Sequence, residues 1–375
     1  MTTNQTDHLS DDELRAALEL RDLTDPDAGP HAMQQLDDEI VRAVARLSGS
    51  EVRRVRHSPL VSVAANYDAL GYGAADVTRN GRYSRYVSPT VMLRSHTSAM
   101  MPVALASHDG VDNVLYAAAG LAYRRDAIDR THTGEPHQLD LWRVGRTTSW
   151  TADDLVAQLG AIADAVLPGC RWRVTSSLHS YTVGGLQLDV WDDASGEWLE
   201  LAEGGLVAPW LLDAAGLPSE RWTGVAAGLG LDRALMLRKH VPDIRLLRSG
   251  DPRVARQMLD LSSYQPISMM PPVRRDLSVV LRWGTDEEVL GDRIRSALGD
   301  RAEDLEAVEL VGVTSYDDLP EGARRRLGLR AGQVNALVRM TLRAIDHTLT
   351  ADEANRLRDA VYLAIHEGPV RELIG

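Results

Sequence analysis

The chain has 375 residues, a length typical of two or three domains. Its apolar fraction of 44% and charged fraction of 25% are those of a globular protein that buries a core. The formal net charge of -13 excludes a generally basic coat, so any nucleic-acid contact must be local.

No run of 18 uncharged apolar residues occurs, and we therefore expect no membrane-spanning segment. The first twenty residues are acidic and polar and lack the pattern of a signal peptide. A single cysteine, Cys170, excludes an intramolecular disulfide and a cysteine-rich zinc site, and it suits a cytoplasmic protein.

Residues 1–50 are predicted to form an N-terminal helical arm. Apolar residues recur there near helical spacing, and the prolines between residues 26 and 30 interrupt them. A solvated, irregular arm is the alternative interpretation. Residues 51–262 alternate strand-like runs with turns, such as HQLDLWRV and the hairpin VWDDASGEWLEL. They predict an α+β catalytic domain built on an antiparallel sheet with flanking helices. The absence of GxGxxG and GxxxxGK[ST] leaves nucleotide-binding folds of those kinds without support.

The composition of the sequence changes at SSYQPISMMPPVRRD, whose three prolines indicate a linker. Residues 263–375 then read as strand, helix, strand, strand and helix. That order is the one found in ferredoxin-like α/β sandwiches. We therefore predict a second, smaller domain of this kind.

The segment AYRRDAIDRTHTGEPHQLDLWRV, residues 122–144, is rich in groups that bind ligands. Gln138 and Asp140 alternate along a predicted strand and therefore share a face, where a carboxylate beside an amide suits an ammonium group. The arginine pair supplies forked donors suited to phosphate. Taken alone, the segment is better explained as a solvated basic turn followed by an amphipathic strand.

Two further segments favour a ligand site. In GVAAGLGLDRALM a glycine-rich strand enters a helix, with Arg233 near the helix start, which is a natural place for a phosphate. In MLRSHTSAM, His96 and Ser98 occupy alternate positions before a helix.

Together these segments resemble a class II aminoacyl-tRNA synthetase of the phenylalanyl type, in its single-chain, mitochondrial-like form. LRSHTSAM resembles a family segment, YRRDAIDRTHTGEPHQLD resembles motif 2, and GLGLDRALM resembles motif 3. PPVRRDLSVVL and DHTLTADEANRLRDAVYLAIHEG resemble the C-terminal ferredoxin-like anticodon-binding domain. These segments occur in the family's order over most of residues 60–370.

The resemblance implies activation of an amino acid by ATP with Mg²⁺, followed by transfer of the acyl group to tRNA. It makes Arg124, His132 and Arg233 catalytic, and it assigns ATP binding to these three residues together with Asp126 and Pro136. It places the amino acid against His96, Ser98, Gln138, Asp140, His179, Tyr181, Glu203 and Ala226. It makes Arg274, Arg275, Arg282, Arg339 and Arg343 candidates for tRNA contact. Magnesium is expected to bridge phosphates, and no protein side chain is assigned to a metal.

The departures from the family pattern gather where the amino acid would bind. His179 and Tyr181 replace two phenylalanines, and Glu203 stands in a turn that is otherwise Gly-Cys-Gly. Pro136 replaces a ring that stacks on adenine, and Asp140 replaces a glutamate. Because buried polar groups require partners, these residues suit a polar aromatic, heteroaromatic or cationic amino acid. Phenylalanine remains the alternative, since Tyr181 still offers a ring edge.

Three functions follow from these residues. The first is charging of a tRNA, expected to be one for phenylalanine. The second is a paralogue that activates an amino acid for specialised small-molecule biosynthesis. The third is a catalytically weak regulator that binds tRNA. The region that pairs subunits in this family, residues 65–87, is too divergent to decide between a monomer and a homodimer.

Overall fold

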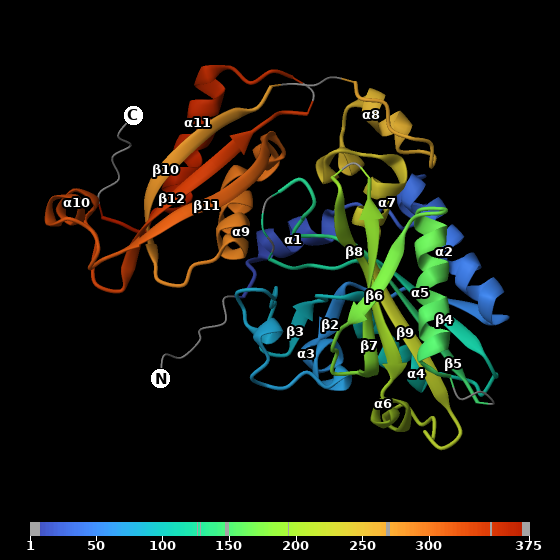
Figure 1. The fold of residues 1–375 in the computed structure, drawn as a ribbon. Coiled ribbons are helices and arrows are strands. Elements are labelled where there is room, and N and C mark those ends of the chain that lie inside the picture. Colours follow the sequence, from blue (N-terminus) through green and yellow to red (C-terminus); the bar gives the residue numbers. More distant parts are fainter. Residues whose placement is uncertain are drawn as a thin grey trace. The chain divides into compact units, whose positions relative to one another are not determined.

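The computed structural model describes residues 8–125, 127, 129–146, 150–193, 195–267, 271–345 and 347–369. The chain divides into two compact units (Figure 1). The first unit comprises Met1–Arg124, Glu135–Pro242 and Arg256–Tyr264, and the second comprises Arg125–Gly134, Asp243–Ala255 and Gln265–Gly375. Each unit is described by itself below.

The first unit is built on a sheet of seven described strands in the order β1-β4-β5-β9-β8-β7-β6. Neighbouring strands are antiparallel except β1 and β4, which are parallel. The strands are β1 (Glu51–Val55), β4 (Val114–Leu121), β5 (His137–Gly145), β6 (Trp172–Ser176), β7 (Thr182–Asp192), β8 (Glu197–Val207) and β9 (Thr223–Gly230). A separate two-stranded sheet pairs β2 (Leu60–Ser62) with β3 (Val91–Leu93).

Helices of the first unit begin and end at residues suited to those positions. A capping box of Thr151 and Asp154 starts α5, and Gly49 in the left-handed conformation ends α2. The helices are α1 (Asp11–Glu19), α2 (Ala32–Ser48), α3 (Val63–Asn66), α4 (Met101–Ala106), α5 (Ala152–Val166), α6 (Pro209–Ala214) and α7 (Leu231–Lys239). Helix α8 (Pro252–Gln257) crosses the division between the units.

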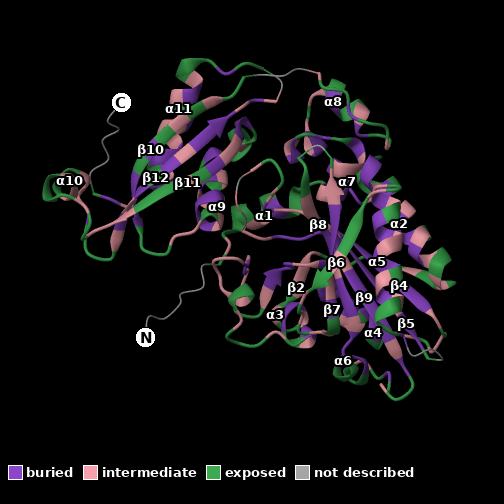
Figure 2. Ribbon diagram, viewed as in Figure 1, coloured by how far each residue is buried: buried purple, intermediate pink, exposed green. Residues whose placement is uncertain are grey.

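The two faces of the seven-stranded sheet are covered by different elements. Helices α2 and α5 pack on each other, and α5 lies on one face through contacts with β8 and β9 (Figure 1). On the other face an apolar cluster joins α4 and α6 to the sheet through residues that include Met101, Leu211 and Trp142. The central strands β4 and β5 are largely buried, whereas the edge strand β6 is not (Figure 2).

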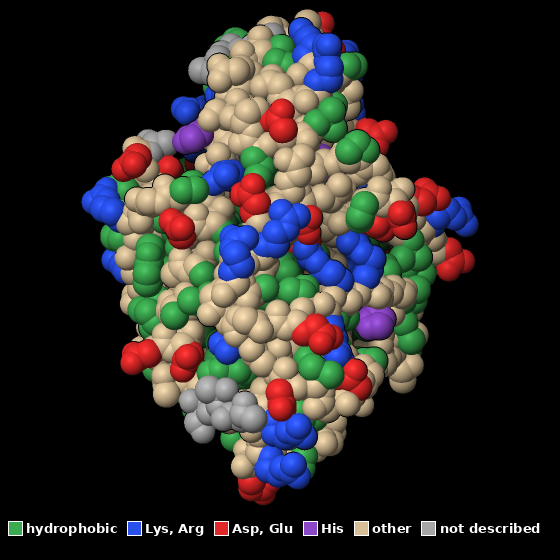
Figure 3. Space-filling view, turned by 90° about the vertical axis from the view of Figure 1, so that its right-hand side faces the viewer, with side chains coloured by type: hydrophobic (Ala, Val, Ile, Leu, Met, Phe, Trp, Pro, Cys, Tyr) green, Lys and Arg blue, Asp and Glu red, His purple; other side chains and the backbone are tan. Residues whose placement is uncertain are grey.

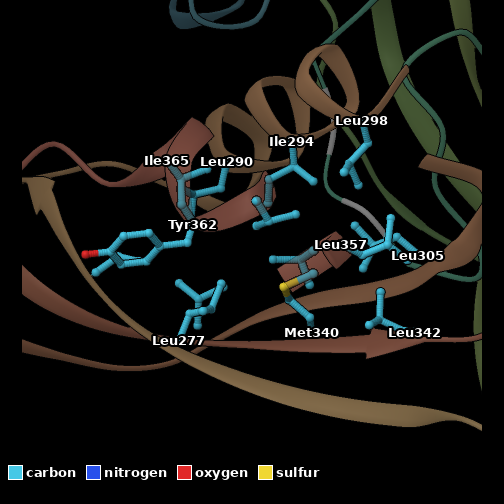
Figure 4. Close-up of a cluster of buried hydrophobic side chains, with 14 of the residues drawn as sticks. Leu277, Leu290, Ile294, Leu298, Leu305, Met340, Leu342, Leu357, Tyr362 and Ile365 are labelled. Atoms are coloured by element: carbon cyan, nitrogen blue, oxygen red, sulfur yellow. The ribbon is translucent and has the colours of Figure 1, made fainter. Parts of the chain in front are cut away.

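The second unit contains a described three-stranded antiparallel sheet in the order β10-β12-β11. Its elements are β10 (Val273–Arg282), α9 (Glu287–Leu298), β11 (Leu305–Ser315), α10 (Glu321–Leu327), β12 (Gln333–Leu342) and α11 (Ala351–Ile365). Alternate residues of the strands, among them Leu277, Met340 and Leu342, pack against α9 and α11 (Figure 4). After α11 the chain returns to β10, because the N–H of Glu367 donates to the carbonyl of Val280 at 2.8 Å.

The prediction of an α+β protein with a large antiparallel sheet flanked by helices is confirmed. The compact units differ from the predicted ranges in two places. The described part of residues 1–50 belongs to the first unit, where the backbone N–H of Leu23 bonds to His137 of the sheet. Residues 125–134 and 243–255 group with the C-terminal unit, although both segments were predicted in the catalytic domain. Within the described residues, no helix is long and apolar enough to cross a membrane.

Candidate functional site

Three strands place the candidate amino-acid residues on one face of the first unit's sheet. Gln138, Asp140 and Trp142 alternate along β5 and so point to the same side. The residues opposite them on β9 are Gly230, Gly228 and Ala226. On β8, Glu203 and Gly205 stand opposite Gly228 and Ala226. The site is therefore a row of small residues with polar side chains on both flanks.

Asp140 is buried and accepts three hydrogen bonds. Thr97 Oγ1 donates to Oδ2 at 2.5 Å, and Ser98 Oγ donates to Oδ1 at 2.8 Å. Trp142 Nε1 donates to Oδ1 at 3.1 Å. Burial raises the pKa of Asp140 and these donors oppose that rise. Oδ2 accepts one of the two bonds that a carboxylate oxygen accommodates, so it can still receive an ammonium group.

Gln138 and His96 lie beside this carboxylate. The backbone N–H of Thr97 donates to Gln138 Oε1 at 3.3 Å, which ties the segment Thr97–Met100 to β5. The His96 ring stacks on Tyr72, with ring centroids 5.7 Å apart. Neither ring nitrogen of His96 makes a hydrogen bond of good geometry within the part of the chain that the structure describes. Such buried, unsatisfied groups are the ones that a polar ligand satisfies.

His96 is held in its neutral form. Burial lowers the pKa of its imidazole to about 3, and the positive charge of Arg124 acts in the same direction. At neutral pH the ring therefore carries one N–H donor and one acceptor nitrogen.

His179 and Glu203 form an ion pair at the edge of the row. Their Nε2 and Oε2 atoms are 2.9 Å apart, and Ser177 Oγ donates to Glu203 Oε1 at 2.6 Å. The hydrogen bond that His179 donates to Glu203 raises the pKa of His179, and the same bond lowers the pKa of Glu203. The two side chains therefore satisfy each other's hydrogen-bonding groups, and their opposite charges nearly cancel at this side of the site.

Tyr181 lies at the end of the row formed by Trp142 and Ala226. Its ring stacks on Trp142, with centroids 5.5 Å apart and planes 17° apart. Burial raises the pKa of the Tyr181 phenol well above its usual range, so the ring stays uncharged. Ala226, expected to limit the far end of the substrate side chain, is only 2% exposed beneath these rings.

Two arginines of the first unit converge on Glu200. Arg233, in the first turn of α7, donates from Nη1 to the carbonyl of Glu200 at 3.2 Å. The charges of Arg233 and Arg124 both act on the Glu200 carboxylate, whose pKa is raised by burial and by nearby Glu203. Arg124 and Arg233 are therefore both within electrostatic range of Glu200, and their joint phosphate site stays a prediction. Positive charge beside a helix N-terminus is suited to a phosphate.

The remaining candidate ATP residues are placed differently. Pro136 precedes β5, and its carbonyl accepts the N–H of Ala122 at 2.8 Å. His132 belongs to the second unit, where its Nδ1 lies 2.6 Å from Asp129 Oδ2. Its grouping with Arg124 and Arg233 therefore stays a prediction. Asp126 lies outside the described residues.

Glu200 is the residue that fits a magnesium ion carried by phosphates. Magnesium is usually held by one or two carboxylates together with substrate phosphate oxygens, and the Glu200 carboxylate is within electrostatic range of the two arginines predicted to bind phosphate. In the part of the chain that the structure describes, no group of three or more His, Cys, Asp or Glu residues could hold a metal by itself.

The five arginines expected to contact tRNA do not share one face of the C-terminal sheet. Arg274, Arg282 and Arg339 lie on the face away from the helices, with Arg339 bound to Asp276 through two hydrogen bonds of 2.8 and 2.9 Å. Arg275 points to the helices and donates to Asn355 Oδ1. Arg343 pairs with Glu306. Figure 3 shows another face of the molecule, the side at the right of Figure 1, on which basic and acidic side chains both occur.

The sequence reasoning missed four residues of the site. Thr97, Ser177, Glu200 and Trp142 all contact residues that were predicted. The alternation that selected Gln138 and Asp140 also selects Trp142, so that residue could have been found. The contacts of Ser177 with Glu203 and of Glu200 with Arg233 depend on how β8 pairs with its neighbours, which the sequence pattern does not give.

Comparison with known protein families matches residues 19–258 to the family described as tRNA synthetases class II core domain (F). A phenylalanine--tRNA ligase alpha subunit of Prochlorococcus marinus is 32% identical over 193 residues, which are 51% of this chain and 56% of that protein. The chain thus spans little more than half the length of that relative. A chloroplastic/mitochondrial phenylalanine--tRNA ligase of Arabidopsis thaliana is 26% identical over 81% of this chain and 68% of its own.

Among solved structures, a pyrrolysyl-tRNA synthetase from Desulfitobacterium hafniense aligns with a TM-score of 0.45 and 18% identity. That alignment covers 59% of this chain and 74% of the other.

Proposed function

Since the chain belongs to the family of class II tRNA synthetase core domains of the F type, we propose that it joins an amino acid to AMP and transfers the acyl group to tRNA. The observation that carries the proposal is the layout of the first unit's sheet. Asp140, which we propose binds the ammonium group, accepts a bond from Ser98 close to His96, and the charge of Arg124, which we propose binds phosphate, acts on His96. The charges of Arg124 and Arg233 also act on Glu200. A single ligand made of an amino acid and a nucleotide fits such a layout.

The chemistry requires no side-chain nucleophile. The amino-acid carboxylate attacks the α-phosphorus of ATP, the bond to the β-phosphate oxygen breaks, and pyrophosphate leaves with the electron pair. Gln138 and Asp140 hold the ammonium group so that the carboxylate faces the phosphorus. Arg124 neutralises charge that develops on the α-phosphate, and Arg233 neutralises the outer phosphates.

Neutral His96 is suited to the reacting carboxylate. Because its pKa is depressed, its N–H can bind an oxygen of the substrate without forming a tight ion pair that would weaken the nucleophile. Magnesium, when bound, supplies further charge neutralisation on the phosphates, and Glu200 is the residue we assign to hold it.

The proposal has two alternatives for the amino acid that is activated. Phenylalanine is the amino acid named in the matched relatives. A more polar amino acid is the alternative, because His179 and Glu203 line the site where the resemblance places aromatic rings. The tRNA, its expected specificity for phenylalanine and its contact with the C-terminal unit are part of the proposal, as is a cytoplasmic location.

A charging assay tests the proposed function. The protein is incubated with total tRNA, ATP, magnesium and each labelled amino acid in turn, and acid-precipitable label is counted. We expect ATP-dependent label in tRNA with one amino acid. Adenylate formation without any labelled tRNA would favour an acceptor used in small-molecule biosynthesis. Tight tRNA binding without adenylate formation would favour a regulator.

A further inference from the structure

The small residues of β9 that face the site are Gly230, Gly228 and Ala226. The space above the two glycines is open, whereas the space above Ala226 is filled by side chains. A methyl group added at Gly230 would meet nothing within 4 Å, and one added at Gly228 would have the Asp140 carboxylate as its nearest neighbour, at an ordinary contact distance of 3.6 Å. The backbone is therefore approachable beside Gln138 and Asp140, where the head group of an amino acid is expected to lie.

The opposite end of the row is filled. Trp142 is completely buried, and Ala226 opposite it is 2% exposed. A methyl group at Gly205, the next residue across, would clash with Thr182 at 2.6 Å. The Tyr181 ring covers Trp142 as a stacked lid. A substrate side chain therefore cannot reach Ala226 unless these rings move.

Trp142 is fixed in this position by two contacts. Its indole N–H donates a hydrogen bond to Asp140, which also accepts hydrogen bonds from Thr97 and Ser98. The indole ring therefore lies against the carboxylate that is proposed to bind the head group. Tyr181 holds its outer face. Rotating Trp142 away would break the hydrogen bond and the stack together, and would leave a buried indole N–H without its acceptor.

One direction is left for the substrate side chain. Glu203 faces Gly228 from β8, the neighbouring strand, so a side chain pointing that way meets the Glu203–His179 pair. That pair has one partner of each charge and each satisfies the other. It therefore suits an uncharged group that forms hydrogen bonds better than a full charge.

We propose that Trp142, held by Tyr181, limits the amino acid to one with a side chain shorter than that of phenylalanine and ending in an uncharged hydroxyl or amide. The proposal rests on the proposed amino-acid activation and selects its non-phenylalanine branch. Trp142 is thus a specificity-determining residue.

Amino-acid-dependent ATP–pyrophosphate exchange tests this with the full chain. Wild-type protein and Trp142→Val are compared on alanine, serine, threonine, asparagine, glutamine and phenylalanine. We expect kcat/KM of the wild type to be at least tenfold higher for one short polar amino acid than for phenylalanine. We expect Trp142→Val to change that ratio at least tenfold in favour of phenylalanine. Trp222→Val, which shortens another buried tryptophan of the same apolar cluster, is the matched control and should leave the ratio unchanged.

The proposal is overturned if the wild type has its highest kcat/KM with phenylalanine. It is also overturned if Trp142→Val melts cooperatively, and so is folded, but has the same ratio of kcat/KM values as the wild type. If Trp142→Val does not fold, wild-type protein is titrated with seryl-, asparaginyl- and phenylalanyl-sulfamoyl adenosine and its melting temperature recorded. Stronger stabilisation by a short polar analogue supports the size limit. Equal or stronger stabilisation by the phenylalanyl analogue, or none by any of them, contradicts it. Analogue binding with no exchange on any amino acid would instead contradict the proposed function alone.

Discussion

Asp232 binds His137 through both of its carboxylate oxygens. Oδ1 lies 3.0 Å from His137 Nδ1, and Oδ2 accepts the backbone N–H of the same residue at 2.5 Å. The other ring nitrogen, Nε2, accepts the backbone N–H of Leu23 at 3.0 Å. This buried arrangement joins α7, β5 and the N-terminal segment. It also fixes the residues that follow Asp232 and His137 in sequence, Arg233 and Gln138.

Replacing Asp232 with alanine should destabilise the first unit. The change leaves the N–H groups of His137 without their buried acceptor, which we expect to cost about 2–4 kcal/mol in the free energy of unfolding. Urea denaturation followed by circular dichroism measures this cost. Asp109→Ala, which breaks an exposed pair with Arg53, should cost less than about 1 kcal/mol. Equal effects of the two substitutions would show that the buried arrangement contributes no special stability.

Arg124→Ala and Arg233→Ala should each impair adenylate formation. Each removes positive charge from the proposed phosphate site, and we expect a loss of about 10²–10³ in kcat/KM for ATP. Arg233→Lys keeps the charge but not the forked donors and should lie between wild type and alanine. Steady-state exchange kinetics at varied ATP concentrations measure these losses. Full activity of either alanine variant would place the phosphates elsewhere.

The His179–Glu203 pair should make stability depend on pH. The pKa of His179 is raised in the folded state, so its contribution is complete below the unfolded value of about 6.5 and is lost as pH rises through the folded value. The pKa of Glu203 is lowered, so its contribution is complete above about 4.5 and is lost as pH falls. The difference in melting temperature between wild type and His179→Gln should therefore be largest near pH 5.5 and shrink by pH 9. A difference that is constant from pH 5 to pH 9 would mean that the pair is not ionic.

The two faces of β10 should respond differently to loss of an arginine. Arg274 and Arg282 lie on the face away from the helices, so Arg274→Ala with Arg282→Ala should raise KM for tRNA about tenfold and leave ATP–pyrophosphate exchange unchanged. Arg275→Ala removes the bond to Asn355 in α11 and should lower stability without changing KM for tRNA. The charging assay at constant salt concentration measures both. An unaltered KM in the double variant would exclude this face from tRNA contact.

Periodicity in the sequence was enough to predict the large antiparallel sheet and the shared face of Gln138 and Asp140. It could not predict which segments pack together over long distances. The described N-terminal residues join the first unit because His137, which Asp232 holds in place, accepts the N–H of Leu23, and no local pattern contains that contact. Residues 125–134 join the second unit through pairs such as Arg125 with Asp292.

The chemistry of the site was only partly predictable for a related reason. His179 and Glu203 were selected as separate polar residues, whereas the structure shows one ion pair whose members satisfy each other. Arg275 and Arg343 were selected as tRNA contacts through the resemblance, which says nothing of their neighbours in the fold. The structure shows Arg275 bonded to Asn355 and Arg343 paired with Glu306, and their contact with tRNA stays a prediction.

Amino-acid-dependent ATP–pyrophosphate exchange across the twenty standard amino acids, by wild type and Arg124→Ala side by side, tests the central claim that this sheet face forms an aminoacyl adenylate. We predict exchange that requires one amino acid in the wild type and falls at least a hundredfold in Arg124→Ala. Wild-type protein that catalyses no exchange with any amino acid, or a variant that equals it, would contradict the account.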